Sequence, residues 1–137
     1  MTTFRAAERA RELLTLAGEM RVDEMLEYFA PDVVMELPYA PGKMARRYDG
    51  FEAVSGFMAF ARNAFSSFTM TIDALHETTD PLLVIAEHHS DGIVAENGRP
   101  YRNRYVTFIH FDDGGRVVAW REHYDPGVVV RAFRASP

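Results

Sequence analysis

One carboxylate, Glu122, stands in this sequence where aromatic and hydroxyl-bearing neighbours could adjust its affinity for a proton. Residues 99–125 alternate apolar and polar side chains on both sides of Asp113-Gly114, a dipeptide typical of a two-residue type I′ turn. Counting outward from that turn places Tyr105 opposite Glu122 on one face of a two-stranded hairpin. A carboxyl group among such side chains loses hydration, so its pKa rises and it can transfer protons near neutral pH.

The same count predicts the other pairs of this hairpin. They are Thr107 with Trp120, Ile109 with Val118 and Asn103 with Tyr124. A second type I′ signal, Asn97-Gly98, joins the preceding strand to the hairpin. The pairs expected there are Val94 with Tyr101, Ser90 with Tyr105, His88 with Thr107 and Ala86 with Ile109. Gly92 could host a bulge that shifts this register by one residue.

Together the two registers gather a candidate set for proton transfer on one face. Glu122 would be the acid or base, and Tyr105 would donate to a carbonyl oxygen or a developing enolate. His88, one layer deeper, would be a second acid or base or an orienting group, and Ser90 completes the set. All these assignments depend on the register, because a slip of one residue turns every side chain to the other face.

Each of these residues also has a plainer structural interpretation. Glu122 follows Arg121 near a strand end, where a carboxylate often forms an ordinary ion pair. His88 and His89 are adjacent, so they point to opposite faces and cannot serve one site. Trp120 could belong to the core instead of contacting a ligand.

Metal and nucleotide sites have little support in the sequence. Glu87, His89 and Asp91 share a face and form the best metal candidate, but they lack a recognised ligand spacing. No glycine-rich phosphate loop and no G-x-S-x-G elbow is present. We therefore expect no metal and no cofactor. The seven methionines are expected to fill gaps in the core, although Met35 and Met58 could line a pliable apolar pocket.

The elements that must position these side chains follow from hydrophobic periodicity and turn residues. Helices are predicted at 4–17, 22–29 and 50–65, with Pro31 ending the second. Strands are predicted at 33–37, 46–48, 68–77, 82–95 and in the two arms of 99–125, and a short helix at 128–135. Gly56 inside the third helix suggests a close backbone approach.

Composition narrows the class of protein. The 137 residues suit a single domain, and 47% hydrophobic with 26% charged residues is ordinary for a globular chain. A net charge of −5 argues against nucleic-acid and anionic-membrane partners. The chain has no cysteine, no N-terminal signal-peptide pattern and no long apolar run, so a cytoplasmic protein without disulfides is expected.

Three stretches carry a family resemblance: LEYFAPDVVMELPYAPG, RRYDGFEAVSGFM and RPYRNRYVTFIHFDDGGRVVAWREHYDP. With the order of elements, they resemble the SnoaL-like, ketosteroid-isomerase-related branch of the NTF2-like superfamily. The resemblance implies an α+β fold, a cystatin-like cone in which three N-terminal helices wrap a curved, mixed and mostly antiparallel sheet. It also implies a pocket on the concave face, whose wall would include Met35, Leu37, Tyr39, Phe57, Ala61, Ser90, Thr107, Trp120 and Tyr124.

Some positions of this sequence differ from the catalytic residues of the families it resembles. The catalytic positions of steroid isomerases align with Leu13, Leu37 and Thr107, so that machinery is replaced here. The Arg-Glu-x-x-x-Pro pattern from Arg121 to Pro126 is similar instead to the phenazine-biosynthesis PhzA/PhzB group, in which the glutamate matching Glu122 acts as acid and base.

The resulting expectation is a cofactor-independent enzyme that isomerises, cyclises or dehydrates a small, partly apolar carbonyl compound. The alternative is a non-catalytic, ligand-binding or accessory dimeric module. Epoxide hydrolysis would need a water held by carboxylates, and only one inward carboxylate is expected. The resemblance also implies a homodimer formed through the outer sheet face, with Val106, Phe108, His110, Ala119 and Arg121 in the interface.

Overall fold

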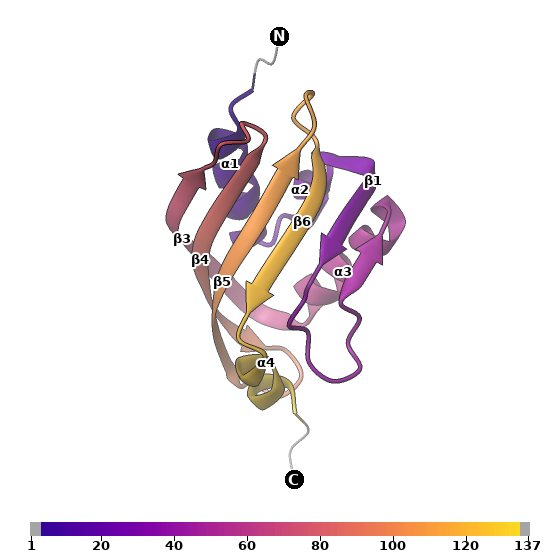
Figure 1. Ribbon diagram of the computed structural model, residues 1–137. Helices are drawn as coiled ribbons and strands as arrows, with labels where there is room; N and C mark the ends of the chain where they lie inside the picture. The colour runs from indigo at the N-terminus through magenta and orange to yellow at the C-terminus, as the bar shows by residue number, and fades with distance from the viewer. Residues whose placement is uncertain (1–3, 135–137) are drawn as a thin grey trace.

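The computed structural model describes residues 4–134, which form one six-stranded sheet with helices on one face and at one end (Figure 1). The elements in chain order are α1 (Ala6–Gly18), α2 (Val22–Leu26), β1 (Phe29–Glu36), β2 (Arg47–Asp49), α3 (Phe51–Asn63), β3 (Phe65–Glu77), β4 (Leu83–Val94), β5 (Pro100–Phe111), β6 (Val117–Tyr124) and α4 (Pro126–Phe133). The strand order is β2-β1-β6-β5-β4-β3, and β1 and β6 are the one parallel pair among the described strands. The predicted α+β cone with a mixed, mostly antiparallel sheet is confirmed.

Helices α1, α2 and α3 cover the same face of the curved sheet, and α4 lies at its end (Figure 1). The buried side chains of α1 recur at helical spacing, and Ala10, Leu13 and Leu14 pack into the core beside the sheet. Their partners in the sheet include Val84, Ile109, Phe111 and Val117. No helix within residues 4–134 has the length and apolar character needed to cross a membrane.

The structure corrects several predicted element boundaries. The second helix ends at Leu26, and Phe29 already belongs to β1, where it pairs with Val117 of β6. Pro31 therefore lies inside a strand, within the irregular stretch before Val34, where its missing N–H breaks no regular ladder. Gly56 is exposed with no other group near its missing side chain, so the close backbone approach that would explain a glycine there does not occur.

The β5–β6 hairpin differs from the predicted register by two residues. Its turn is one residue longer, because the N–H of Asp112 donates to the carbonyl of Arg116 and Gly115 takes a positive φ of 84°. A bulge at Val118 adds a second residue. Two single shifts restore the side-chain orientation beyond the bulge, so the residues from Ala119 onward keep their predicted faces but have new partners. Nearer the turn the prediction is wrong, because Val117 and not Val118 is buried in the core beside Ile109. The observed pairs are Tyr105 with Tyr124, Thr107 with Glu122 and Ile109 with Trp120.

The predicted register of the β4–β5 hairpin is also wrong by two residues. Val94 pairs its N–H with the carbonyl of Arg99, so four residues form the connection instead of two. The observed pairs are Ser90 with Asn103, His88 with Tyr105 and Ala86 with Thr107. The bulge considered at Gly92 is absent from this ladder, where Gly92 pairs regularly with Tyr101. Gly92 instead allows close approach of β3, since a Cβ there would lie 2.8 Å from the carbonyl oxygen of Ser67.

Candidate functional site

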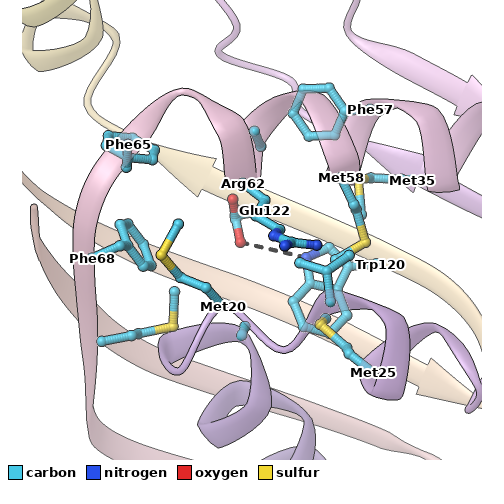
Figure 2. A pocket seen from close by; sticks show the side chains of 14 residues that line it. Met20, Met25, Met35, Phe57, Met58, Arg62, Phe65, Phe68, Trp120 and Glu122 are labelled. Carbon is cyan, nitrogen blue, oxygen red and sulfur yellow. Dashed lines mark hydrogen bonds between the residues drawn. The ribbon is translucent and has the colours of Figure 1, made fainter. Parts of the chain in front are cut away.

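Glu122 projects from β6 into the space between the sheet and the helices (Figure 2). The indole Nε1–H of Trp120 and the hydroxyl of Thr107 both donate to its Oε1, each over 3.4 Å. Its Oε2 accepts no hydrogen bond from any other residue in 4–134. Burial raises the pKa of Glu122 to about 7, and the two long hydrogen bonds oppose this rise only partly. The group can therefore both give and take a proton near neutral pH.

The ordinary ion pair with Arg121 does not form. Arg121 follows Trp120 on the opposite face of β6, where its guanidinium lies 4.5 Å from the centre of the Phe108 ring. The sheet thus separates Glu122 from its neighbouring positive charge, because successive side chains of a strand point to opposite faces. No described salt bridge includes Glu122.

Glu122 lies where two apolar chambers meet. The methionine chamber, about 130 Å³, is lined by Ala17, Met20, Val22, Met25, Met35, Phe57, Met58, Ala61, Arg62, Phe65, Phe68, Met70, Trp120 and Glu122. The tyrosine chamber, about 380 Å³, is lined by Leu37, Met44, Tyr48, Phe57, Phe60, Ala61, Ala64, Phe65, Phe68, Met70, Tyr101, Tyr105, Glu122, Tyr124, Val129 and Phe133. Among residues 4–134, Glu122 is the one acidic side chain in either lining, most of the wall is apolar, and no described salt bridge pairs this carboxylate with a cation.

His88 supports the carboxylate from behind the cavity wall. Its side chain is buried, its ring stacks on Tyr105, and its Nε2 lies 2.8 Å from the hydroxyl of Thr107. Because the single Thr107 proton is donated to Glu122, Nε2 of His88 must carry the proton in this bond. Burial lowers the pKa of His88 to about 4, and its Nδ1 has no hydrogen-bond partner among the described residues. His88 is thus a neutral orienting group and lines neither chamber.

A second hydrogen-bonded chain ends in the tyrosine chamber. Ser90 Oγ and Tyr105 Oη are 2.7 Å apart, Tyr105 donates to Tyr101 over 3.2 Å, and the Asn103 amide donates to Tyr101 over 3.1 Å. Tyr101 accepts both bonds, so its own proton is left for another acceptor. Burial raises the pKa of both Tyr101 and Tyr105, which keeps the two hydroxyls protonated.

Tyr124 is the second free donor of the tyrosine chamber. Its hydroxyl forms no hydrogen bond with another residue in 4–134, and its ring meets the Tyr105 ring edge-on at 6.3 Å. Burial raises the pKa of Tyr124 to about 12. Tyr124 and Tyr101 therefore present neutral O–H groups in the same chamber as the Glu122 carboxylate.

The structure brings most of the predicted site together. Eight predicted residues line the chambers: Met35, Leu37, Phe57, Ala61, Tyr105, Trp120, Glu122 and Tyr124. Ser90, Thr107 and His88 stand behind the wall and act through hydrogen bonds. Tyr39 lies outside it, 55% exposed, with its ring 5.2 Å from that of His123.

Several lining residues escaped the sequence prediction. Tyr101 alternates with Asn103 and Tyr105 along β5, so the strand period contained the information needed to place it. Arg62 follows Met58 by one helical turn on α3, and the same stripe that indicated Phe57 and Ala61 could have included it. Met20 and Met25 had been expected to fill the core.

The three residues that formed the best metal candidate each lie beside a different side chain of the chain, on the outer face of the sheet. Glu87 lies 2.6 Å from His76, His89 lies 2.8 Å from Asp73, and Asp91 lies 3.4 Å from Arg102. No group of three or more potential ligand side chains in residues 4–134 could hold a metal ion.

Known proteins are similar to this chain in sequence. A family model described as a SnoaL-like domain matches residues 10–120. An uncharacterised Bacillus subtilis protein, YesE, is 31% identical over 132 residues, covering 96% of this chain and 89% of its own length. An uncharacterised PhzA/B-like protein of Pseudomonas aeruginosa is 31% identical over 101 residues, covering 73% of this chain and 70% of its own.

Solved structures agree with the sequence matches. A Bacillus subtilis protein provisionally assigned as an isomerase superposes with a TM-score of 0.82 at 33% identity, covering 93% of this chain and 91% of that one. An NTF2-like protein of unknown function from Burkholderia pseudomallei has a TM-score of 0.79 at 20% identity, covering 93% and 96%. The chain therefore belongs to the SnoaL-like family and has the NTF2-like cone fold.

Proposed function

We propose that the protein is a cofactor-independent enzyme that transfers a proton within a small, partly apolar carbonyl compound. The observation that carries this proposal is Glu122, whose Oε2 is free in an apolar cavity and whose pKa is raised to about 7. A general acid or base works best when its pKa lies near the working pH. The provisional isomerase assignment of the Bacillus subtilis structure supports the same class of chemistry.

The reacting carbonyl would lie at the junction of the chambers. The hydroxyl of Tyr124 or Tyr101 donates to its oxygen, while Oε2 of ionised Glu122 takes a proton from the carbon beside the carbonyl. The electron pair of the broken C–H bond forms a C=C bond, and the carbonyl π electrons move to oxygen. The enolate then takes the proton back from Glu122 at the same or another carbon, which regenerates the carbonyl and the carboxylate.

The groups around Oε1 prepare this step. Thr107 and Trp120 hold Oε1 by hydrogen bonds, which leaves Oε2 directed at the ligand. The long bonds stabilise the carboxylate weakly, so it stays basic enough to remove a proton. Isomerisation, aldol-type cyclisation and dehydration can all begin with such an enolate, and the same site could therefore catalyse any of the three.

The test uses proton exchange on a simple ketone. In D2O near neutral pD, the protein is expected to catalyse deuterium incorporation beside the carbonyl of 4-oxo-4-phenylbutanoate, followed by proton NMR. Glu122→Gln should lower that rate at least about a hundredfold, the usual contribution of a general base. An unchanged rate in the variant would exclude Glu122 as the base. Binding of the ketone without exchange by the wild type would favour the non-catalytic ligand-binding module.

The outer sheet face supports a proposed homodimer. Val106 is 39% exposed there, and Phe108 lies under the Arg121 guanidinium on the same face. Light scattering should give twice the chain mass, and Val106→Glu should shift it toward the monomer. A monomeric wild type would remove this part of the proposal.

A further inference from the structure

We infer that Arg62 binds a carboxylate of the ligand, so that the compound acted on is an apolar carbonyl compound that also carries an acid group. This inference rests on the proposed function for the position of the carbonyl at Glu122. It adds the chemical class of the substrate and a residue that selects it.

Arg62 is the one basic side chain in the linings of the two chambers, as far as residues 4–134 define them. It comes from the last turn of α3, one turn after Met58. Figure 2 shows Arg62 and Glu122 reaching into the methionine chamber from the helix and from the sheet. The remaining lining of this chamber is apolar apart from the Trp120 indole, which already donates to Glu122.

The guanidinium of Arg62 forms no salt bridge with a described carboxylate, Glu122 included. Other arginines of the chain do form such bridges, among them Arg9, Arg21, Arg47 and Arg102. A cation near a helix C-terminus also interacts favourably with the helix dipole. That role explains a basic residue at this end of α3, but it does not require the side chain to line a cavity shared with an acid.

The chemistry of the site favours a carboxylate as the bound anion. A guanidinium matches a carboxylate through two parallel hydrogen bonds, and Arg is weakly hydrated enough to pair beside an apolar surface. A phosphate would call for further donors such as a glycine-rich loop, and the sequence contains none.

The volumes of the two chambers indicate where the other parts of the ligand would lie. A cavity of about 150 Å³ can hold a benzene ring, so the tyrosine chamber of about 380 Å³ can take a ring with substituents. The methionine chamber, about 130 Å³, then accommodates the short chain that carries the carboxylate toward Arg62. Glu122 lies in both linings, at the point where the carbonyl would join these two parts.

The experiment compares two probes of the same shape and different charge. Binding of 4-oxo-4-phenylbutanoate and of its neutral amide, 4-oxo-4-phenylbutanamide, is measured by calorimetry or ligand-observed NMR. A hydrogen bond to a charged group contributes about 1.5–3 kcal/mol, so the wild type should bind the carboxylate at least about tenfold more tightly. Arg62→Met should remove that preference and leave amide binding unchanged, while Arg62→Lys should retain part of it.

Arg11→Met is the matched control, because Arg11 and Arg62 are both exposed helical arginines and only Arg62 lines a chamber. It should bind both probes as the wild type does. Equal affinities of the wild type for the two probes, no binding of the carboxylate, or an unchanged preference in Arg62→Met would each overturn the inference. Glu122→Gln separates it from the proposed function, since this variant should lose exchange but keep the charge preference.

Discussion

Thr107 of β5 lies directly opposite Glu122 of β6, and its hydroxyl donates to Oε1 of that carboxylate. The same hydroxyl accepts from His88, so a buried imidazole fixes the direction in which the Thr107 proton points. Glu122 is thereby oriented by a neutral chain of donors instead of by a cation. A cation would lower its pKa, whereas this arrangement leaves the pKa raised by burial.

Removing the Thr107 hydroxyl should change the Glu122 pKa as well as the rate. Thr107→Val deletes a donor that stabilises the carboxylate, so the pKa of Glu122 should rise above about 7. It also leaves Nε2–H of His88 unpaired, which should cost about 1–3 kcal/mol of stability. The pH profile of ketone exchange should move to higher pH, and Thr107→Ser should restore the wild-type profile. A profile that stays in place in the valine variant would contradict the proposed orienting role.

Trp120 offers a direct measure of the Glu122 pKa, because it is the only tryptophan in the sequence and donates to this carboxylate. When Glu122 ionises, the indole N–H of Trp120 donates to a charged carboxylate instead of a neutral carboxyl group. Tryptophan fluorescence should therefore titrate with a midpoint near pH 7. The transition should vanish in Glu122→Gln. A transition that survives in this variant would assign the titration to another group.

Glu122 should also make the folded state less stable as the pH rises. Its pKa is raised from 4.5 to about 7 on folding, so the folded protein binds more protons than the unfolded chain between these values. The stabilisation is complete below about pH 4.5 and is lost as the pH rises through about 7. A shift of this size corresponds to about 3 kcal/mol.

Glu122→Gln isolates this contribution, because glutamine does not titrate and His88 is present in both proteins. The free energy of unfolding of the variant, relative to the wild type, should rise by about 3 kcal/mol between pH 4.5 and 8 in urea titrations. The variant would then be more stable and less active at neutral pH, as expected for a group held in an unfavourable environment for function. A difference that does not change with pH would contradict the burial of an ionisable Glu122.

The sequence was sufficient to predict which face Tyr105, Thr107, Trp120 and Glu122 occupy, but not their partners, and it placed Val118 instead of Val117 in the core. Asp113-Gly114 located the turn correctly, yet Gly115 adopts the positive φ and Val118 forms a bulge. Each feature shifts the ladder by one residue, and the choice between turn types depends on twist and packing that a dipeptide does not specify. Glu122 therefore faced the cavity as predicted, while Thr107 replaced Tyr105 as its partner.

The cavity itself was harder to predict, because its walls come from segments far apart in the chain. Tyr39 shares the alternation of β1, but the strand ends at Glu36 and the chain turns outward. Arg62 was overlooked because a charged residue at a helix end is usually solvated. It is exposed here as well, and only the packing of α3 against β1 and β3 shows that it also lines the cavity. Periodicity predicts faces, whereas a pocket requires the relative placement of helices and sheet.

The two glycines Gly92 and Gly56 should respond oppositely to substitution by alanine. A Cβ at Gly92 would lie 2.8 Å from the Ser67 carbonyl, a contact that forces β3 and β4 apart. Gly92→Ala should therefore lower the free energy of unfolding by about 1–3 kcal/mol, as overpacking does. Gly56 is exposed inside α3 with nothing near its missing side chain, so Gly56→Ala should raise it by about 1 kcal/mol.

Urea denaturation of the two variants measures both effects, and each serves as the control for the other. Phe68 also lies against Gly92, at 3.2 Å from the same Cβ position, and it lines both chambers. Gly92→Ala should therefore weaken binding of the ketone probe in addition to lowering stability, because β3 carries one wall of the cavity. Gly56→Ala should leave binding unchanged. Equal stability of Gly92→Ala and the wild type would show that β3 can move away without cost, and the close strand contact would then have no role in shaping the cavity.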